Sequence, residues 1–408
     1  MYDIEWTGNR MTRTDDAFCS LMAPEKVERA ARFHQSFPQY APTPLANLRG
    51  LAERFGLGGV YIKDESFRFG LNAFKVLGGS YAVARYIAKL AGENMDRVDY
   101  ARLTSASLWE RLGQATFFTA TDGNHGRGVA WTARQLGQKA VVYMPKGSSR
   151  VRFDNIRAEG AAVTIENANY DECVRIAGAA AQKTPGGVIV QDTAWEGYKE
   201  IPTWIMQGYG TMAAEAAEQL GRRPTHIFVQ AGVGSLAGAV QGYFANIYRD
   251  DPPVVTVIEA DEAACLYLSV KAADGAIHAV GGDMPTIMAG LACGEPNPIS
   301  FDILRNHAKF FASCPNWVAA KGMRVLGAPL EGDSRVISGE SGAVGLGLLA
   351  AIMEDEGLKG FREALGLGPE SVALLFSTEG DTDPENYRRV CWDGAYGGPR
   401  LMRLEEGE

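Results

Sequence analysis

Apolar and polar positions along this chain form two patterns that alternate from end to end. Short runs rich in β-branched and aromatic residues predict strands at 59–63, 116–120, 139–144, 161–165, 187–191, 225–230, 254–259 and 372–376. Longer segments with apolar residues at helical spacing predict helices at 75–90, 127–137, 150–159, 170–183, 205–219, 236–248, 302–313 and 342–355. Strands and helices that alternate in this way indicate an α/β protein with open, mostly parallel twisted sheets flanked by helices.

The spacing of these elements predicts two domains. Strand–helix units follow one another closely between residues 76 and 195, which favours a small open-sheet domain there. The flanking segments, 1–75 and 196–408, then join into a larger domain with its own sheet. We expect a ligand in the cleft between the two sheets, because open α/β sheets bind ligands beyond the carboxyl ends of their strands.

Composition narrows the class of partner. The net charge is −9, and no basic run is interleaved with aromatic residues, which argues against nucleic-acid binding. The first residues are acidic where a signal peptide would be basic and apolar, and no apolar run reaches membrane-spanning length. We therefore expect a cytoplasmic protein that has no membrane partner and acts on a small molecule.

Cysteine and histidine spacing predicts no metal site. The six cysteines form no CxxC pair, and the five histidines show no HExxH pattern. Free thiols are the expectation for a reducing cytoplasm. Cys265 and Cys293 both lie in loop-like stretches, so the sequence leaves a bridge between them open.

Lys75 is the first candidate for chemistry. It follows the predicted strand 59–63 and a polar loop, and it stands next to Phe74 where an amphipathic helix begins. A lysine held there, away from the solvated face, is able to lose its proton and act as an amine nucleophile. The alternative is an ordinary solvated surface lysine.

Two glycine-rich loops strengthen the functional interpretation. Asp122, Asn124 and His125 follow the predicted strand 116–120 and open a helix, which directs them into the crevice of an open sheet. The second loop, Gly232-Val233-Gly234-Ser235-Leu236-Ala237-Gly238, links a strand to a helix. Backbone N–H groups at such a helix start form a seat for a phosphate.

Further polar residues follow other predicted strands. Asp192 follows 187–191, and Ser377 and Thr378 follow 372–376, while Glu340 opens the helix near 342. The hydroxyl of Ser377 or Thr378 would hydrogen-bond a heterocyclic nitrogen and leave it unprotonated. The carboxylate of Glu340 would instead protonate such a nitrogen. Helix capping explains each of these residues singly.

Together these segments resemble the fold-type-II pyridoxal phosphate (PLP) enzymes, the tryptophan synthase β-like family. Phe74-Lys75 resembles the family's Ser-Phe-Lys motif with Ala73 in place of Ser, and Gly123-Asn124-His125 resembles its Gly-Asn-His segment. Gly232 to Gly238 resembles its phosphate loop, with Val233 and Ser235 in place of two glycines. The resemblance spans roughly residues 30 to 395 and is closest to the branch that acts on diaminopropionate; it is carried by 69–75, 121–128, 191–197, 288–298 and 377–383.

The resemblance implies PLP as cofactor, held by Lys75 in the cleft between a small and a large domain, and a homodimer. It implies that Asn124 contacts the cofactor's 3′-oxygen, and it gives cofactor-binding roles to Phe74, Gly232, Val233, Gly234, Ser235, Gly238, Glu340, Ser377 and Thr378. The implied reaction is elimination of ammonia from 2,3-diaminopropionate, leaving pyruvate. Lys75 would take the α-proton of the L-isomer. If Asp122 stands on the opposite face of the cofactor, it would take the α-proton of the D-isomer.

The two acids fit that substrate on chemical grounds. Related serine and threonine dehydratases usually carry a hydroxyl residue where this chain has Asp122. An amine leaving group is cationic when protonated, so a carboxylate attracts it where a hydroxyl would not. Asp192 at its strand end would hold the same ammonium, and burial beside the cofactor would tune a carboxylate to accept a proton.

Three alternatives remain at this stage. A serine or threonine dehydratase or a β-replacement enzyme would share every cofactor residue. An NAD-dependent oxidoreductase would use the Gly232 loop as its main site, although the GxGxxxG spacing is one residue too long and Lys75 would have no role. A non-catalytic binding protein would need the phosphate loop but not Lys75, Asp122 and Asp192 together.

Overall fold

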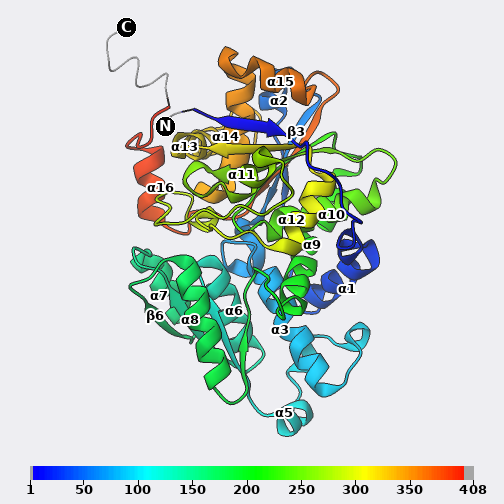
Figure 1. The fold of residues 1–408 in the computed structure, drawn as a ribbon, viewed down its shortest axis with the longest axis vertical. Helices are drawn as coiled ribbons and strands as arrows, with labels where there is room; N and C mark the ends of the chain where they lie inside the picture. The colour runs from blue at the N-terminus through cyan, green and yellow to red at the C-terminus, as the bar shows by residue number, and fades with distance from the viewer. Residues whose placement is uncertain (1–2, 399–408) are drawn as a thin grey trace.

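The computed structural model describes residues 3–398 and contains two separate sheets (Figure 1). The larger sheet has the strand order β1 (Glu5–Gly8), β10 (Phe310–Cys314), β9 (Val254–Ala260), β8 (His226–Gln230), β11 (Val372–Ser377), β3 (Gly59–Asp64) and β2 (Leu45–Asn47). Its edge strands β1 and β2 pair antiparallel with β10 and β3, and the other neighbours are parallel.

The smaller sheet is entirely parallel. Its order is β6 (Ala162–Ile165), β5 (Lys139–Met144), β4 (Thr116–Ala120) and β7 (Gly187–Ile189). Figure 1 shows α6, α7 and α8 grouped around it in the lower part of the view, and α11, α13, α14 and α16 in the upper part. The predicted fold class of two open, mostly parallel sheets flanked by helices is confirmed, and the domain boundaries at 76 and 195 stay a prediction.

Helices connect and cover the strands. In chain order the α-helices are α1 (Pro24–Gln35), α2 (Arg49–Phe55), α3 (Val76–Ala91), α4 (Tyr100–Leu103), α5 (Ala106–Leu112), α6 (Asn124–Gln135), α7 (Arg150–Ala158), α8 (Tyr170–Lys183), α9 (Glu200–Leu220), α10 (Ser235–Ile247), α11 (Cys265–Ala272), α12 (Pro298–His307), α13 (Asn316–Gly327), α14 (Glu340–Glu354), α15 (Lys359–Leu365) and α16 (Pro384–Cys391). Short 3₁₀ turns lie at Cys19–Met22, Glu65–Gly70, Met95–Arg97, Asp261–Ala263, Ala289–Leu291 and Glu356–Leu358. Within residues 3–398 no helix combines the length and the apolar character needed to cross a bilayer.

The predicted helix 302–313 is wrong at its C-terminal end. Helix α12 stops at His307, and 310–314 form strand β10. The run Phe310-Phe311-Ala312 is apolar enough for either element, and tertiary pairing decides, since β10 is hydrogen-bonded between β9 and β1. Strands β1 and β2, of four and three residues, were not predicted.

Helix α3 crosses α9 at a pair of glycines, and this crossing fixes the segment that starts at Lys75. A Cβ on Gly78 would lie 2.6 Å from Ile205 Cγ2, and one on Gly208 would lie 2.9 Å from Gly78 Cα. Neither position has room for a side chain, so the two backbones approach closely. The helix that follows Lys75 is thereby held against the long helix of the larger sheet.

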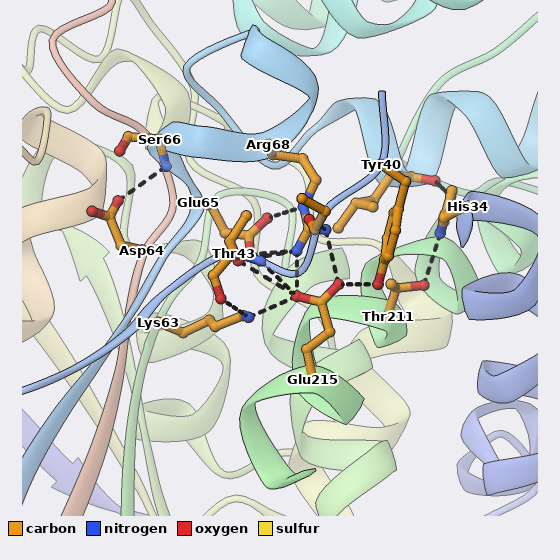
Figure 2. A network of polar contacts seen from close by, with 12 residues as sticks. His34, Tyr40, Thr43, Lys63, Asp64, Glu65, Ser66, Arg68, Thr211 and Glu215 are labelled. Carbon is orange, nitrogen blue, oxygen red and sulfur yellow. Dashed lines mark hydrogen bonds and ion pairs between the residues drawn. The ribbon is translucent and has the colours of Figure 1, made fainter. Parts of the chain in front are cut away.

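A buried ionic network holds the turn just before Lys75 (Figure 2). Glu215 on α9 accepts hydrogen bonds from Lys63 on β3 at 2.6 Å and from Arg68 in the 65–70 turn at 2.7 and 2.8 Å. Arg68 also donates two hydrogen bonds of 2.8 Å to Glu65, and Thr43 donates one of 2.6 Å to the same carboxylate. Two cations therefore face two anions, and each buried charge has a partner.

The charge of Glu215 is central to this network. Burial alone would raise the pKa of its carboxyl, but Arg68 and Lys63 together outweigh burial and lower the pKa from 4.5 to about 2. A depressed pKa in the folded state stabilises the fold above the unfolded value. That stabilisation is therefore complete above about pH 4.5 and is lost as the pH falls toward about 2.

We expect Glu215→Gln to lower the free energy of unfolding by about 3–5 kcal/mol, because it leaves a buried cation without its partner. Urea unfolding followed by circular dichroism at pH 7 measures this change. Glu218→Gln, at an exposed position on the same helix, is the matched control and should shift unfolding very little. Equal shifts in the two variants would contradict a stabilising role for the network.

Candidate active site

Lys75 forms an ion pair with Asp192 between the two sheets. Lys75 is the last residue before α3, and Asp192 follows β7 of the smaller sheet. The Lys75 amine donates a hydrogen bond to Asp192 Oδ2, and the two side chains are 18% and 3% exposed. The rings of Phe74 and Tyr209 flank the amine, with centres 5.6 and 5.8 Å from Nζ. Two residues that are 117 positions apart in the sequence are therefore direct partners.

The ion pair sets the charge of both groups. Burial alone would lower the pKa of Lys75, but the carboxylate of Asp192 outweighs burial and raises it. Burial alone would raise the pKa of Asp192, but the charge of Lys75 outweighs it and holds this pKa below its usual range. The sequence led us to expect a lowered pKa for Lys75 and a raised pKa for the carboxyl. While the two side chains remain paired, both pKa shifts have the opposite direction.

Hydrogen bonds tie Asp192 to the neighbouring loops. The Tyr170 hydroxyl donates to Asp192 Oδ1 at 3.3 Å and accepts from Gln191 Nε2 at 2.6 Å. On the backbone side, the Ser235 hydroxyl donates to the Asp192 carbonyl, and Asn297 donates to Ser235 Oγ at 2.8 Å. The start of α10 is therefore fixed beside the residue that pairs with Lys75.

The glycine loop before α10 has the form of a phosphate seat. Gly234 has φ +95°, and a Cβ there would lie 2.9 Å from Ser300 Oγ. No residue in the described part of the chain accepts a hydrogen bond from the backbone N–H groups of Val233, Gly234 or Ser235. Free N–H groups at a helix start, with glycines that let a ligand approach, fit the phosphate of PLP.

The same pocket also offers a hydroxyl for a ring nitrogen. Thr378 Oγ1 accepts a hydrogen bond of 2.8 Å from Gln230 Nε2, so its own hydrogen is available for another acceptor. Asn124 also lines the pocket, and its amide donates to Glu379 Oε2 at 2.5 Å. A hydroxyl donor in this place suits a pyridine nitrogen that stays unprotonated.

The pocket opens into a cavity of about 400 Å³ between the two sheets. Lys75, Asp122 and Cys293 line both the cavity and the narrower pocket at the glycine loop. Asp122 is 20% exposed, and its Oδ2 accepts a hydrogen bond of 3.2 Å from Arg152. A small amino acid in this cavity would have the Lys75 amine and the Asp122 carboxylate as its neighbours.

Three other predicted cofactor residues lie outside the lining of the narrower pocket. Gly238 lies one turn inside α10, where a Cβ would be 2.6 Å from Ser300 Cβ, so it permits contact with α12. Ser377 Oγ donates to Ser338 Oγ at 2.9 Å. Glu340 accepts from Asn386, and burial, followed by the charge of Glu379, raises its pKa to about 7. Their roles toward a cofactor stay predictions.

Cys265 and Cys293 lie close together as free thiols. The Cys265 thiol lies 3.6 Å from both the Cys293 carbonyl oxygen and Glu259 Oε1, either of which is able to accept its one hydrogen. Burial raises the pKa of both thiols well above its ordinary value. The structure therefore contains no bridge at the position where the sequence left one open.

Comparison with known proteins shows the family of the chain. Residues 37–363 match the model of the pyridoxal-phosphate dependent enzyme family. The chain belongs to this family. It is 53% identical to diaminopropionate ammonia-lyase of Salmonella typhimurium over 383 residues, covering 93% of this chain and 95% of that protein, and 51% identical to the enzyme of Escherichia coli, covering 92% and 94%.

Solved structures agree with the sequence relatives. The Escherichia coli diaminopropionate ammonia-lyase in complex with D-serine superimposes with a TM-score of 0.90 at 47% identity, covering 97% of this chain and 98% of that one. A threonine deaminase of Solanum lycopersicum has a TM-score of 0.70 at 20% identity, covering 97% and 92%, and shows the shared fold alone. The predicted resemblance to the fold-type-II family and PLP as its cofactor are confirmed.

Several residues of the site were not predicted from the sequence. Tyr170 begins a helix and Gln230 ends a strand, so their positions could have indicated the crevice, although neither residue type singles itself out. Arg152 could not be distinguished from Arg150 and Arg157 on the same predicted helix. Its contact with Asp122 exists only in the folded chain.

We expect Gly234→Val to weaken PLP binding by more than about tenfold, because a side chain would occupy the approach to the N–H groups and strain a left-handed backbone. Titration of the apoprotein with PLP measures the affinity. Gly221→Val is the matched control, since Gly221 also has a positive φ, +63°, but ends α9 in open space. If both variants bind PLP with unchanged affinity, the loop is only a strand–helix turn.

Proposed function

We propose that this chain eliminates ammonia from 2,3-diaminopropionate to give pyruvate and ammonia, and that it accepts the L- and D-isomers. The pairing of Lys75 with Asp192, in a cavity that Asp122 also lines, carries this proposal. The diaminopropionate ammonia-lyases at 53% and 51% identity support the choice of substrate.

Bound PLP supplies an electron sink that delocalises the negative charge left at Cα when a proton is removed. In our proposal Lys75 holds the cofactor covalently, and the N–H groups of 233–235 bind its phosphate. The Thr378 hydroxyl would donate to the ring nitrogen, and Asn124 would contact the 3′-oxygen. The free N–H groups and the available hydroxyl hydrogen support these assignments.

Two bases are needed because the α-protons of the two isomers lie on opposite faces of the substrate. We assign the L-isomer to Lys75, whose amine becomes a base once Asp192 has another cationic partner. The D-isomer is assigned to Asp122, which stands in the same cavity as a carboxylate paired with Arg152. Each base then takes one proton from Cα on its own side.

The charge of the leaving group predicts a preference for diaminopropionate over serine. When Lys75 is no longer an ammonium, Asp192 would be a buried carboxylate without a partner. The β-ammonium of diaminopropionate replaces that positive charge, whereas the neutral hydroxyl of serine does not, and an unpaired buried charge is strongly destabilising. The Tyr170 hydroxyl, at 3.3 Å from Asp192 Oδ1, completes the polar surroundings of the leaving amine.

We also propose that the protein is a cytoplasmic homodimer. The free thiols fit a reducing compartment, and the family resemblance supports the dimer. Light scattering of the purified protein checks the dimer, and a molar mass equal to one chain would refute it.

Asp122→Asn is the sharpest test of the two-base assignment, since it keeps the shape of the side chain and removes its basicity. We expect turnover of D-diaminopropionate to fall by about two or more powers of ten, as for the loss of a general base. Turnover of the L-isomer should fall much less. Steady-state kinetics on the two pure enantiomers measures both effects.

The control is Lys75→Ala, which should abolish the visible absorption of lysine-bound PLP and the turnover of both isomers. An equal loss of both isomers in Asp122→Asn would make Asp122 a holder of the leaving ammonium instead. Unchanged turnover of both would mean that Asp122 takes no part in the reaction.

A further inference from the structure

Arg152 is a buried arginine at the edge of the cavity that the reaction scheme above leaves without a role. It lies in the first turn of α7 and is 7% exposed. Its Nη1 donates to Asp122 Oδ2 at 3.2 Å, and its Nη2 donates to Thr382 Oγ1 at 3.3 Å and lies 3.8 Å from Glu340 Oε2. One guanidinium therefore contacts three separate segments of the chain.

Those segments come from both sides of the cleft. Asp122 follows β4 of the smaller sheet, whereas Glu340 begins α14 and Thr382 follows β11 of the larger sheet. The planar guanidinium has donors in fixed directions, so it is able to hold two oxygen acceptors at once. The position of the Asp122 carboxylate is thereby tied to the opposite wall of the cavity.

The stem of Arg152 is fixed as well. A Cβ on Gly123 would lie 2.8 Å from Arg152 Cδ and 3.2 Å from its Cγ, so the stem packs directly on the backbone next to Asp122. A side chain at residue 123 would push the guanidinium away. Arg152 therefore holds the loop at 122–123 in two ways, through the Asp122 carboxylate and through the backbone of Gly123.

The charge around Arg152 is strongly negative. Burial alone would lower its pKa, but nearby carboxylates outweigh burial and raise it, and these are Glu379, Asp122, Glu340 and Asp383. Arg152 is consequently a permanent cation among acids. Without it, Asp122 would face the other carboxylates with no compensating charge.

We propose that Arg152 is a positioning residue for the D-isomer: it holds the Asp122 carboxylate in place as the base and joins it to the opposite wall of the cleft. This inference rests on the proposed function, because it assigns Asp122 to the D-isomer. Arg152 itself takes no proton. Its effect should therefore appear in kcat for the D-isomer more than in KM, and only while Asp122 is present.

Arg152→Met and Arg152→Lys test the proposal, with Arg150→Gln as the matched control. Arg150 lies on the same helix, is 67% exposed, forms an ion pair with Asp154 and lies 4.5 Å from the centre of the Phe153 ring. We expect Arg152→Met to lower kcat for D-diaminopropionate by about tenfold or more, a part of the general-base contribution, with a much smaller effect on the L-isomer. Arg152→Lys keeps the charge and should restore part of the loss, and Arg150→Gln should change neither isomer.

A double-mutant cycle separates positioning from a general structural effect. In the Asp122→Asn background, Arg152→Met should cause no further loss of D-isomer turnover, because the base it positions is already gone. Equal losses for both isomers, or full additivity with Asp122→Asn, would overturn the proposal.

Thermal unfolding of the apoprotein gives a readout that does not depend on turnover. Arg152→Met should lower the melting temperature, because buried carboxylates lose their cation, while Arg150→Gln should leave it unchanged. An unchanged melting temperature in Arg152→Met would mean that these contacts do not hold the loop, against the proposal. If Asp122→Asn itself spares the D-isomer, the proposed function fails at that point; if Asp122→Asn is selective and Arg152→Met is not, only this inference fails.

Discussion

The ion pair between Lys75 and Asp192 is the interaction on which the active site depends. It joins the start of a helix packed on α9 to the end of a strand in the smaller sheet, across the cleft between them. A buried pair of this kind is weak evidence for stability, because desolvation of both charges offsets their attraction. The pair matters for the chemistry instead. When the Lys75 amine is used covalently, the buried Asp192 carboxylate loses its partner and needs another cation.

The rest of the fold keeps the two partners in place. The network of Lys63, Glu65, Arg68 and Glu215 fixes the turn that leads to Lys75, and the glycine crossing of α3 and α9 fixes the helix that follows it. Charged groups buried on one side of the cleft are thus compensated within that side. The Arg152 contacts differ from these, because they run from one side of the cleft to the other.

Much of the site could be predicted from the sequence because its residues follow strands. Lys75, Asp122 and Thr378 stand directly after apolar runs or at helix starts, and parallel strands bring such positions to one edge of a sheet. The pairing of Lys75 with Asp192 could not be predicted, since pattern gives position along a strand but not the partner across a cleft. The reversed pKa directions follow from that same missing contact.

In the fold, too, local sequence predicted some elements, and tertiary contacts decided others. The interior strands other than β10 were predicted from their composition, whereas the three-residue edge strand β2 was not. The apolar segment 310–313 fits a helix by itself and becomes a strand because β9 and β1 pair with it on both sides. Gly238 looked like part of the phosphate loop by spacing, but it packs against Ser300 one turn inside the helix.

The most direct test of the account is the reaction of the purified holoenzyme with D- and L-diaminopropionate, serine and threonine. Ammonia and pyruvate are measured together, because diaminopropionate must release two molecules of ammonia for each pyruvate. The β-ammonium of diaminopropionate restores a positive charge opposite Asp192, and the hydroxyl of serine does not. We therefore predict that kcat/KM for diaminopropionate exceeds that for serine by about a hundredfold or more, equivalent to roughly 3 kcal/mol. A serine or threonine turnover equal to or faster than that of diaminopropionate would contradict the account.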